Sequence, residues 1–158
     1  MDKNVIISVK GIQSAEDNDQ VLELVTEGKY YKEDDAYCVT YKESEVTGME
    51  GTTTTLRVSN GIVTLMRMGS VNSHFVFQQG RKHVSYYDTE HGAFTIGVLA
   101  NEVDIRMDDD GGEIRVGYQL EIDNSKSGEN DFFMSIREAG QTDDKHHREH
   151  KTTNQRYC

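Results

Sequence analysis

The sequence predicts an all-β fold, a single antiparallel meander barrel of about 8 to 11 strands. Three observations support this prediction. Apolar and polar residues alternate with a period of two along most of the chain, turn residues interrupt the alternation about every 8 to 12 residues, and none of the 158 residues is proline. Proline would remove hydrogen-bond donors from a strand ladder, so its absence fits a chain made almost wholly of paired strands.

Strands in the first half of the chain follow from alternation and from β-branched content. The first strand places Val5 and Val9 on one face, and four consecutive threonines at 52–55 fit a pleated surface better than a helix. Ser59-Asn60-Gly61 is the strongest hairpin signal, because a type I′ turn needs φ > 0 at both central residues. The predicted strands cover residues 5–10, 21–31, 36–45, 52–58 and 62–68.

Glycine-containing turns separate the strands of the second half. They lie at residues 79–80, 90–92 and 108–112. The longest clean alternation runs through residues 114–122, and no segment has a useful helical period. The predicted strands cover residues 73–78, 81–88, 93–99, 101–108, 114–122 and 131–137.

The predicted strands belong to one domain, residues 1–139. A single open sheet of this size would expose two long edges, so closure into a barrel is the preferred architecture, and a two-sheet sandwich is the alternative. From residue 140 the alternation stops. We expect residues 140–158 to form a polar, largely disordered tail, because they have no apolar face to pack.

Four segments carry a resemblance to a known family. They are YKESEVTGMEGTTT at 41–54, LMRMG at 65–69, YDTEHG at 87–92 and GYQL at 117–120. In this order and spacing they resemble the YwiB-like family of small bacterial proteins. The resemblance implies a calycin-type, lipocalin-like barrel without an established activity, found mostly in Gram-positive bacteria. The chain has no tryptophan and so lacks the first-strand tryptophan of true lipocalins, and a lipocalin ligand class would rest on fold analogy alone.

Composition narrows the classes of function. The chain has 28 acidic and 17 basic residues, a formal net charge of −11, which argues against nucleic-acid binding. No apolar run is long enough for a membrane helix, and the N-terminus does not resemble a signal peptide. The two cysteines, Cys38 and Cys158, are expected to be reduced. We therefore expect a cytoplasmic protein without nucleic-acid or membrane partners.

Arg67 is the main candidate for a ligand-binding residue. It lies on the same strand face as Val63 and Leu65, and if that face points inward the guanidinium needs a carboxylate or an anionic ligand to offset its desolvation. The structural alternative is an ion pair with Glu43 or Glu45.

Five further residues are candidates to line a pocket around Arg67. Tyr41, Tyr87 and Tyr118 would each supply an apolar ring and a hydroxyl that can form a hydrogen bond. Met66 and Phe75 would belong to an adaptable apolar lining. The alternative for each tyrosine is simple core packing. For the methionines and phenylalanines the alternative is a barrel interior filled completely by side chains.

Other chemistry is not indicated by the sequence. His74, His83 and His91 have no partners at a metal or triad spacing, and the tail residues His146, His147 and His150 offer at most adventitious metal binding. The acidic segment 108–113 places Arg106 where an EF-hand needs its first ligand, so a calcium loop does not fit. We expect no cofactor, no metal site and no catalytic residues.

Two functional hypotheses from different classes remain. The first is a non-catalytic module that binds a small amphipathic or anionic molecule. The second is a filled barrel whose acidic surface docks a basic protein partner. An enzyme ranks third, because no nucleophile or phosphate-binding motif is present.

Overall fold

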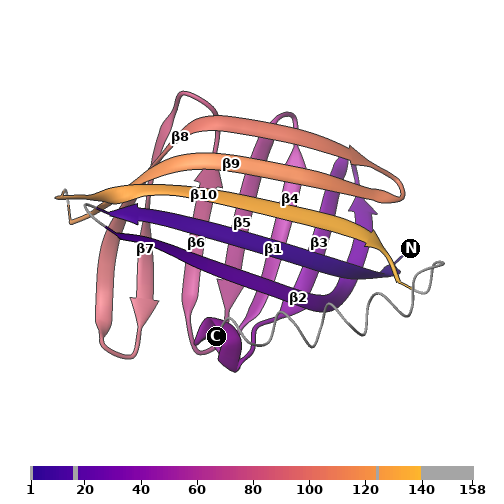
Figure 1. Cartoon of the computed structure of the whole chain (residues 1–158), viewed down its shortest axis with the longest axis horizontal. Coiled ribbons are helices and arrows are strands. Elements are labelled where there is room, and N and C mark those ends of the chain that lie inside the picture. The colour runs from indigo at the N-terminus through magenta and orange to yellow at the C-terminus, as the bar shows by residue number, and fades with distance from the viewer. Residues whose placement is uncertain (1, 16–17, 124, 140–158) are drawn as a thin grey trace.

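The computed structural model describes residues 2–15, 18–123 and 125–139, and these form one closed antiparallel barrel of ten strands (Figure 1). One short 3₁₀ helix, η1 (Glu45–Thr47), interrupts them. No helix in the described ranges is long and apolar enough to cross a membrane. The strands are β1 (Lys3–Ala15), β2 (Asn18–Glu33), β3 (Ala36–Lys42), β4 (Thr53–Ser59), β5 (Ile62–Met68), β6 (Asn72–Phe77), β7 (Lys82–Thr89), β8 (Gly92–Asp108), β9 (Gly111–Ile122) and β10 (Ser125–Glu138).

The barrel is a meander closed by its first strand. Each strand pairs with its neighbours in sequence, and β1 pairs with both β2 and β10. In Figure 1 the long strands β1, β2, β8, β9 and β10 cross the shorter strands β3 to β7 at a steep angle. The prediction of a closed meander barrel is confirmed. The residues of the expected tail, 140–158, lie outside the described residues.

The predicted break between strands at residues 93–99 and 101–108 is wrong. Both segments belong to the single strand β8. The register against β9 shifts between Ala100 and Glu102, which marks a β-bulge. A bulge interrupts the side-chain alternation without ending the strand, and this is why the sequence resembles two strands here.

The turn between β4 and β5 follows the sequence signal. Asn60 has φ 53° and Gly61 has φ 77°, so both central residues of the turn are left-handed, as predicted for this hairpin. A different constraint acts at Gly28, near the point where β2 leaves β3. A Cβ atom there would lie 2.4 Å from the carbonyl oxygen of Thr40 and 2.5 Å from Cδ1 of Ile7, so only glycine fits this close approach.

Inward-facing apolar side chains fill much of the barrel. Phe77 is 2% exposed, and its ring lies 4.8 Å from the ring of Tyr118 and 6.5 Å from that of Phe75, measured between centroids. The largest fully buried apolar side chains come from strands on both sides of the barrel, so they form one continuous core. They are Val5, Ile7, Val39, Leu56, Val63, Phe77, Val98, Ile114, Val116 and Met134.

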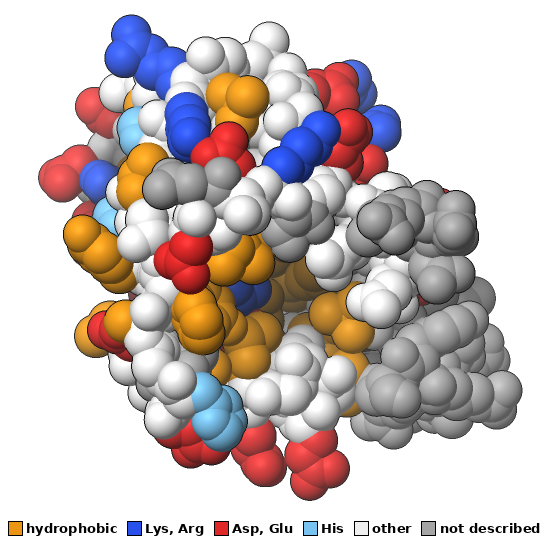
Figure 2. Space-filling model, turned by 90° about the vertical axis from the view of Figure 1, so that its left-hand side faces the viewer, with side chains coloured by type: hydrophobic (Ala, Val, Ile, Leu, Met, Phe, Trp, Pro, Cys, Tyr) orange, Lys and Arg blue, Asp and Glu red, His pale blue; other side chains and the backbone are white. Residues whose placement is uncertain are grey.

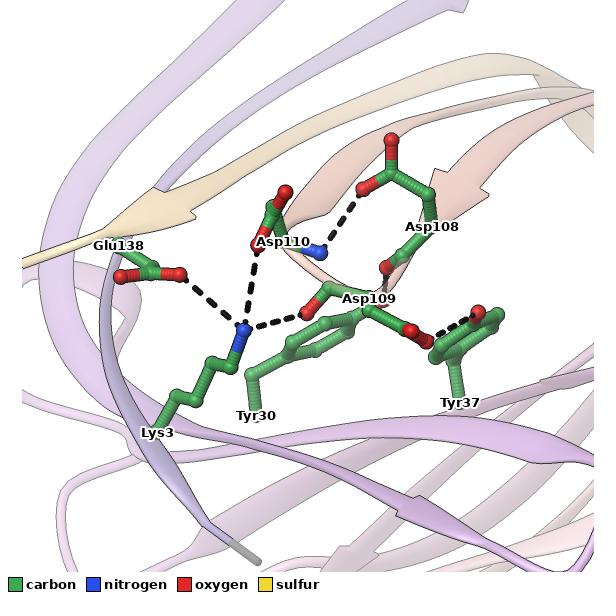
Figure 3. Close-up of polar contacts among 7 residues, drawn as sticks. All are labelled: Lys3, Tyr30, Tyr37, Asp108, Asp109, Asp110 and Glu138. Carbon is green, nitrogen blue, oxygen red and sulfur yellow. Dashed lines mark hydrogen bonds and ion pairs between the residues drawn. The ribbon is translucent and has the colours of Figure 1, made fainter.

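Polar contacts hold the β8–β9 turn against β1, β2 and β3 (Figure 3). Nζ of Lys3 lies 2.9 Å from the carbonyl oxygen of Asp109 and 3.1 Å from Oε1 of Glu138. The hydroxyl of Tyr30 donates to the carbonyl oxygen of Asp108 at 2.6 Å. The ladder pairs Asp108 with Gly111, so this segment is a hairpin turn as predicted, and the contacts above hold it to three other strands.

We predict that Phe77→Ala lowers the free energy of unfolding by about 3 to 5 kcal/mol, because it removes a buried ring and leaves a cavity. Phe133→Ala is the matched control: Phe133 is 38% exposed, and we expect a loss below about 1 kcal/mol. Urea unfolding of both variants checks this prediction. Equal losses would contradict the burial that the structure assigns to Phe77.

Candidate functional site

The barrel interior is not filled along its whole length. A cavity of about 410 Å³ lies between the distal parts of β1 and β2, the η1 segment and the inner wall. Figure 2 shows a hollow surrounded by hydrophobic side chains, with a Lys or Arg side chain visible inside it. Arg67 is the only basic residue among the described residues that line the cavity. The polar lining also includes Gln13, Gln20, Tyr41, Glu43, Thr47, Tyr118, Asn130 and Asp131.

A row of polar side chains crosses the wall formed by β3 to β7. The ladder places Tyr41 opposite Thr54, Thr54 opposite Arg67, Arg67 opposite Ser73, and Ser73 opposite Tyr87. Directly opposed residues share one face of a sheet, so these five residues all belong to the inner face. Thr54 is fully buried and Ser73 is 8% exposed. The strand register thus brings three of the predicted residues into one row.

Arg67 of this row forms a buried ion pair with Glu43, which follows the end of β3. Nε of Arg67 lies 3.8 Å from Oε2 of Glu43, and the side chains are 18% and 1% exposed. The hydroxyl of Thr47 donates to Oε1 of Glu43 at 2.9 Å, and the hydroxyl of Thr54 donates to Oε2. Nε of Arg67 is buried and has no hydrogen-bond partner. The structure therefore selects Glu43 over the exposed Glu45, and leaves part of the guanidinium free to donate.

Asn130 and Tyr118 line the same cavity as Arg67, from β10 and β9. They are paired across β9 and β10, and both line the cavity. Nδ2 of Asn130 is buried without a hydrogen-bond partner. The sequence analysis did not single out Asn130, although alternation places it on the same face as Phe132 and Met134. Two unpaired donors, on Arg67 and Asn130, therefore line one cavity.

The cavity tyrosines are held in the neutral form. Burial raises the pKa of Tyr41, and the neighbouring Glu43 carboxylate adds to the increase, while Arg67 opposes it. Burial likewise raises the pKa of Tyr118, with Arg67 again opposing. Both phenols are therefore hydroxyl donors or acceptors at neutral pH.

The other predicted site residues lie outside the cavity lining. Tyr87 and Phe75 stack with their ring centroids 6.2 Å apart, further along the inner wall. The prediction that Met66 lines the pocket is wrong. Met66 lies on the opposite face of β5 from Leu65 and Arg67, on the outside of the barrel. Neighbouring residues of a strand point to opposite faces, so Met66 and Arg67 could not both point inward.

Metal chemistry has no support in the described part of the chain. No group of three or more His, Cys, Asp or Glu side chains in it could hold a metal ion. The three tail histidines lie outside the described residues. Cys38 is buried, and burial raises the pKa of its thiol, so it is not an activated nucleophile.

Comparison with known proteins agrees with the architecture. A family model described as a domain of unknown function, DUF1934, matches residues 7–134. The uncharacterized beta-barrel protein YwiB of Bacillus subtilis is 25% identical over 119 residues, which cover 75% of this chain and 82% of YwiB. The crystal structure of the ywiB protein matches with a TM-score of 0.75 at 19% identity, over 87% of this chain and 93% of that one. The resemblance to YwiB-like proteins is therefore confirmed.

We predict that Arg67→Met lowers the free energy of unfolding by roughly 2 kcal/mol, because Glu43 stays buried without its counter-ion. The double variant Glu43→Gln/Arg67→Met should lose less than Arg67→Met alone, since it contains no uncompensated charge. Urea unfolding of the wild type, both single variants and the double variant measures the coupling. Additive losses would show that the pair is not coupled in stability.

We predict that stability falls above pH 10 partly because of Tyr41. The ordinary pKa of tyrosine is 10.0, and the folded-state pKa of Tyr41 is raised above it, so the unfolded chain ionises first. The stabilising contribution is complete below pH 10 and is lost as the pH rises. Tyr41→Phe should make this decline shallower by about 1.4 kcal/mol per pH unit. Unfolding curves at several alkaline pH values measure the slope, and an unchanged slope would contradict the prediction.

Proposed function

The chain belongs to the DUF1934 family, a family of domains of unknown function, and we propose that its barrel binds a small amphipathic or anionic molecule in the cavity beside Arg67. The observation that carries this proposal is a guanidinium inside a cavity whose buried Nε has no hydrogen-bond partner. Leaving a buried donor unpaired costs free energy, and a bound acceptor would recover it. The volume of about 410 Å³ suits a small ligand.

The cavity is amphipathic, which supports a ligand with one polar and one apolar end. Arg67, Tyr118 and Asn130 gather polar atoms on the inner walls. Val21 and Leu22 of β2 line the same cavity and are 48% and 36% exposed, so apolar surface continues from the interior to the rim. A ligand with its polar group at Arg67 would cover these side chains with its apolar part. The remaining apolar lining is Val9, Ile12, Leu24, Met49 and Phe132.

A second candidate function is docking of a basic protein partner. The net charge of −11 favours it, and because residues 141–158 hold four basic and three acidic residues, the acidic excess belongs to residues 1–140. Clustered acidic charge speeds association with a basic partner and makes it sensitive to salt. Both candidates are non-catalytic, and we propose the cytoplasm as the location for either, from the acidic charge and the free thiol of Cys38.

We predict that the wild-type protein binds a medium-chain fatty acid such as decanoate, detected by native mass spectrometry and by calorimetric titration. Arg67→Met should weaken binding by about tenfold or more, because it removes the charged donor. Arg115→Met makes the same chemical change at an exposed site outside the cavity lining, and should bind as the wild type does. A wild-type protein that binds no amphiphile would overturn the ligand-binding function.

A salt-dependent pull-down separates the second candidate from the first. Capture of a basic protein that weakens steeply with salt, and that Arg67→Met does not affect, would favour docking through the acidic surface.

A further inference from the structure

In the cavity, the main acceptor group has hydrogen-bond partners within the protein, whereas two donor groups have none. Glu43 accepts hydrogen bonds from Thr47 and Thr54, and its carboxylate raises the pKa of the nearby Tyr41 hydroxyl. The acceptor capacity of this carboxylate is therefore largely used by the protein itself. Two donors are not satisfied in this way: Nε of Arg67 and Nδ2 of Asn130 are both buried and have no hydrogen-bond partner. A ligand that completes this site must therefore present acceptor atoms.

The charges of the cavity limit how negative the ligand can be. Arg67 contributes the one positive charge among the described lining residues, and Glu43, 1% exposed and 3.8 Å away, already offsets it. Asp131 also lines the cavity. The remaining titratable lining residues, Tyr41 and Tyr118, are neutral phenols at neutral pH. The two carboxylates therefore outnumber the one guanidinium in the lining, so a second negative charge on the ligand would add repulsion that no further cation offsets.

Resting on the proposed function, we infer that the site is selective for a singly charged carboxylate and discriminates against a dianionic phosphate. A planar guanidinium matches a carboxylate by parallel hydrogen bonds, and the Asn130 amide can donate to the same group. Glu43 is thereby a specificity-determining residue: it offsets the charge of Arg67 and, with Asp131, leaves no surplus positive charge for a dianion, while Nε of Arg67 still has no hydrogen-bond partner. The ligand class is an amphiphile with one carboxylate and an apolar chain.

Three probes with the same alkyl chain test this inference: decanoate, decyl phosphate and decanol. At pH 8 decyl phosphate is mostly dianionic, and we expect it to bind the wild type about tenfold or more weakly than decanoate. Lowering the pH to about 6 makes much of the phosphate monoanionic. Its affinity should then rise toward that of decanoate, while decanoate itself changes little. Decanol, without a charge, should bind more weakly than decanoate because it lacks the charge-assisted hydrogen bond.

Glu43→Gln tests the residue that imposes the selectivity. This change keeps the shape of the side chain and removes its charge, so the affinity of decyl phosphate relative to decanoate should rise by about tenfold at pH 8. Glu45→Gln is the matched control, two residues away on the exposed η1 segment, and should leave the ratio unchanged. Should Glu43→Gln fail to fold, the pH dependence in the wild type still decides the question.

The outcomes separate the inference from the function on which it rests. Phosphate and carboxylate that bind the wild type equally at pH 8 would overturn the selectivity and leave the ligand-binding function intact. An unchanged ratio in Glu43→Gln would overturn the role of Glu43. Absence of binding by all three probes would overturn the proposed function, and the selectivity with it.

Discussion

Closure of the sheet by β1 is the constraint on which the rest of the structure depends. β1 forms one ladder with β2 and another with β10, so the two ends of the described chain segment meet in the same wall. Without this strand the sheet would present two unpaired edges. Closure also divides every strand into an inner and an outer face. The buried position of Arg67 follows from that division, because its register places it on the inner face of β5, whereas Met66 lies on the outer face.

The charge of Arg67 is tolerated inside the barrel because the residues paired with it on the neighbouring strands are polar. Tyr41, Thr54 and Ser73 occupy the row that Arg67 occupies, and Glu43 receives hydroxyl hydrogen bonds from Thr47 and Thr54. Well-packed apolar residues at these positions would stabilise a barrel as much or more. The ion pair and the adjoining cavity are the two observations on which the proposed ligand binding rests.

The barrel is closed by side-chain contacts near the start of β3 and contains the cavity near its end. Near its start, the Tyr37 hydroxyl donates to Asp109 of the β8–β9 turn at 2.9 Å, and the Tyr37 ring stacks on Tyr30. Near its end, Tyr41 faces the cavity. In the β2–β3 ladder, β3 begins to pair at Lys29, so residues 18–28 of β2 pair only with β1. The β1–β2 hairpin therefore extends past β3, and it forms the apolar rim of the cavity.

Most of the fold was predictable from local pattern. Alternation located the strands, and Asn60-Gly61 fixed one hairpin, because side-chain direction and turn conformation are properties of neighbouring residues. The β-bulge in β8 was not predictable in this way, since it breaks the alternation much as a turn does. The lipocalin-like subclass and the cytoplasmic location stay predictions.

The candidate site, like the fold, was predictable from the sequence only in part. The sequence by itself determined that Arg67 shares a strand face with Val63 and Leu65, and the same rule places Met66 on the other face, contrary to the lining we predicted. Only the tertiary structure decided that Glu43 and not Glu45 pairs with Arg67, that Asn130 faces the same cavity, and that the cavity exists. Alternation is set by adjacent residues, whereas partners and empty volume depend on how strands distant in sequence close around one another.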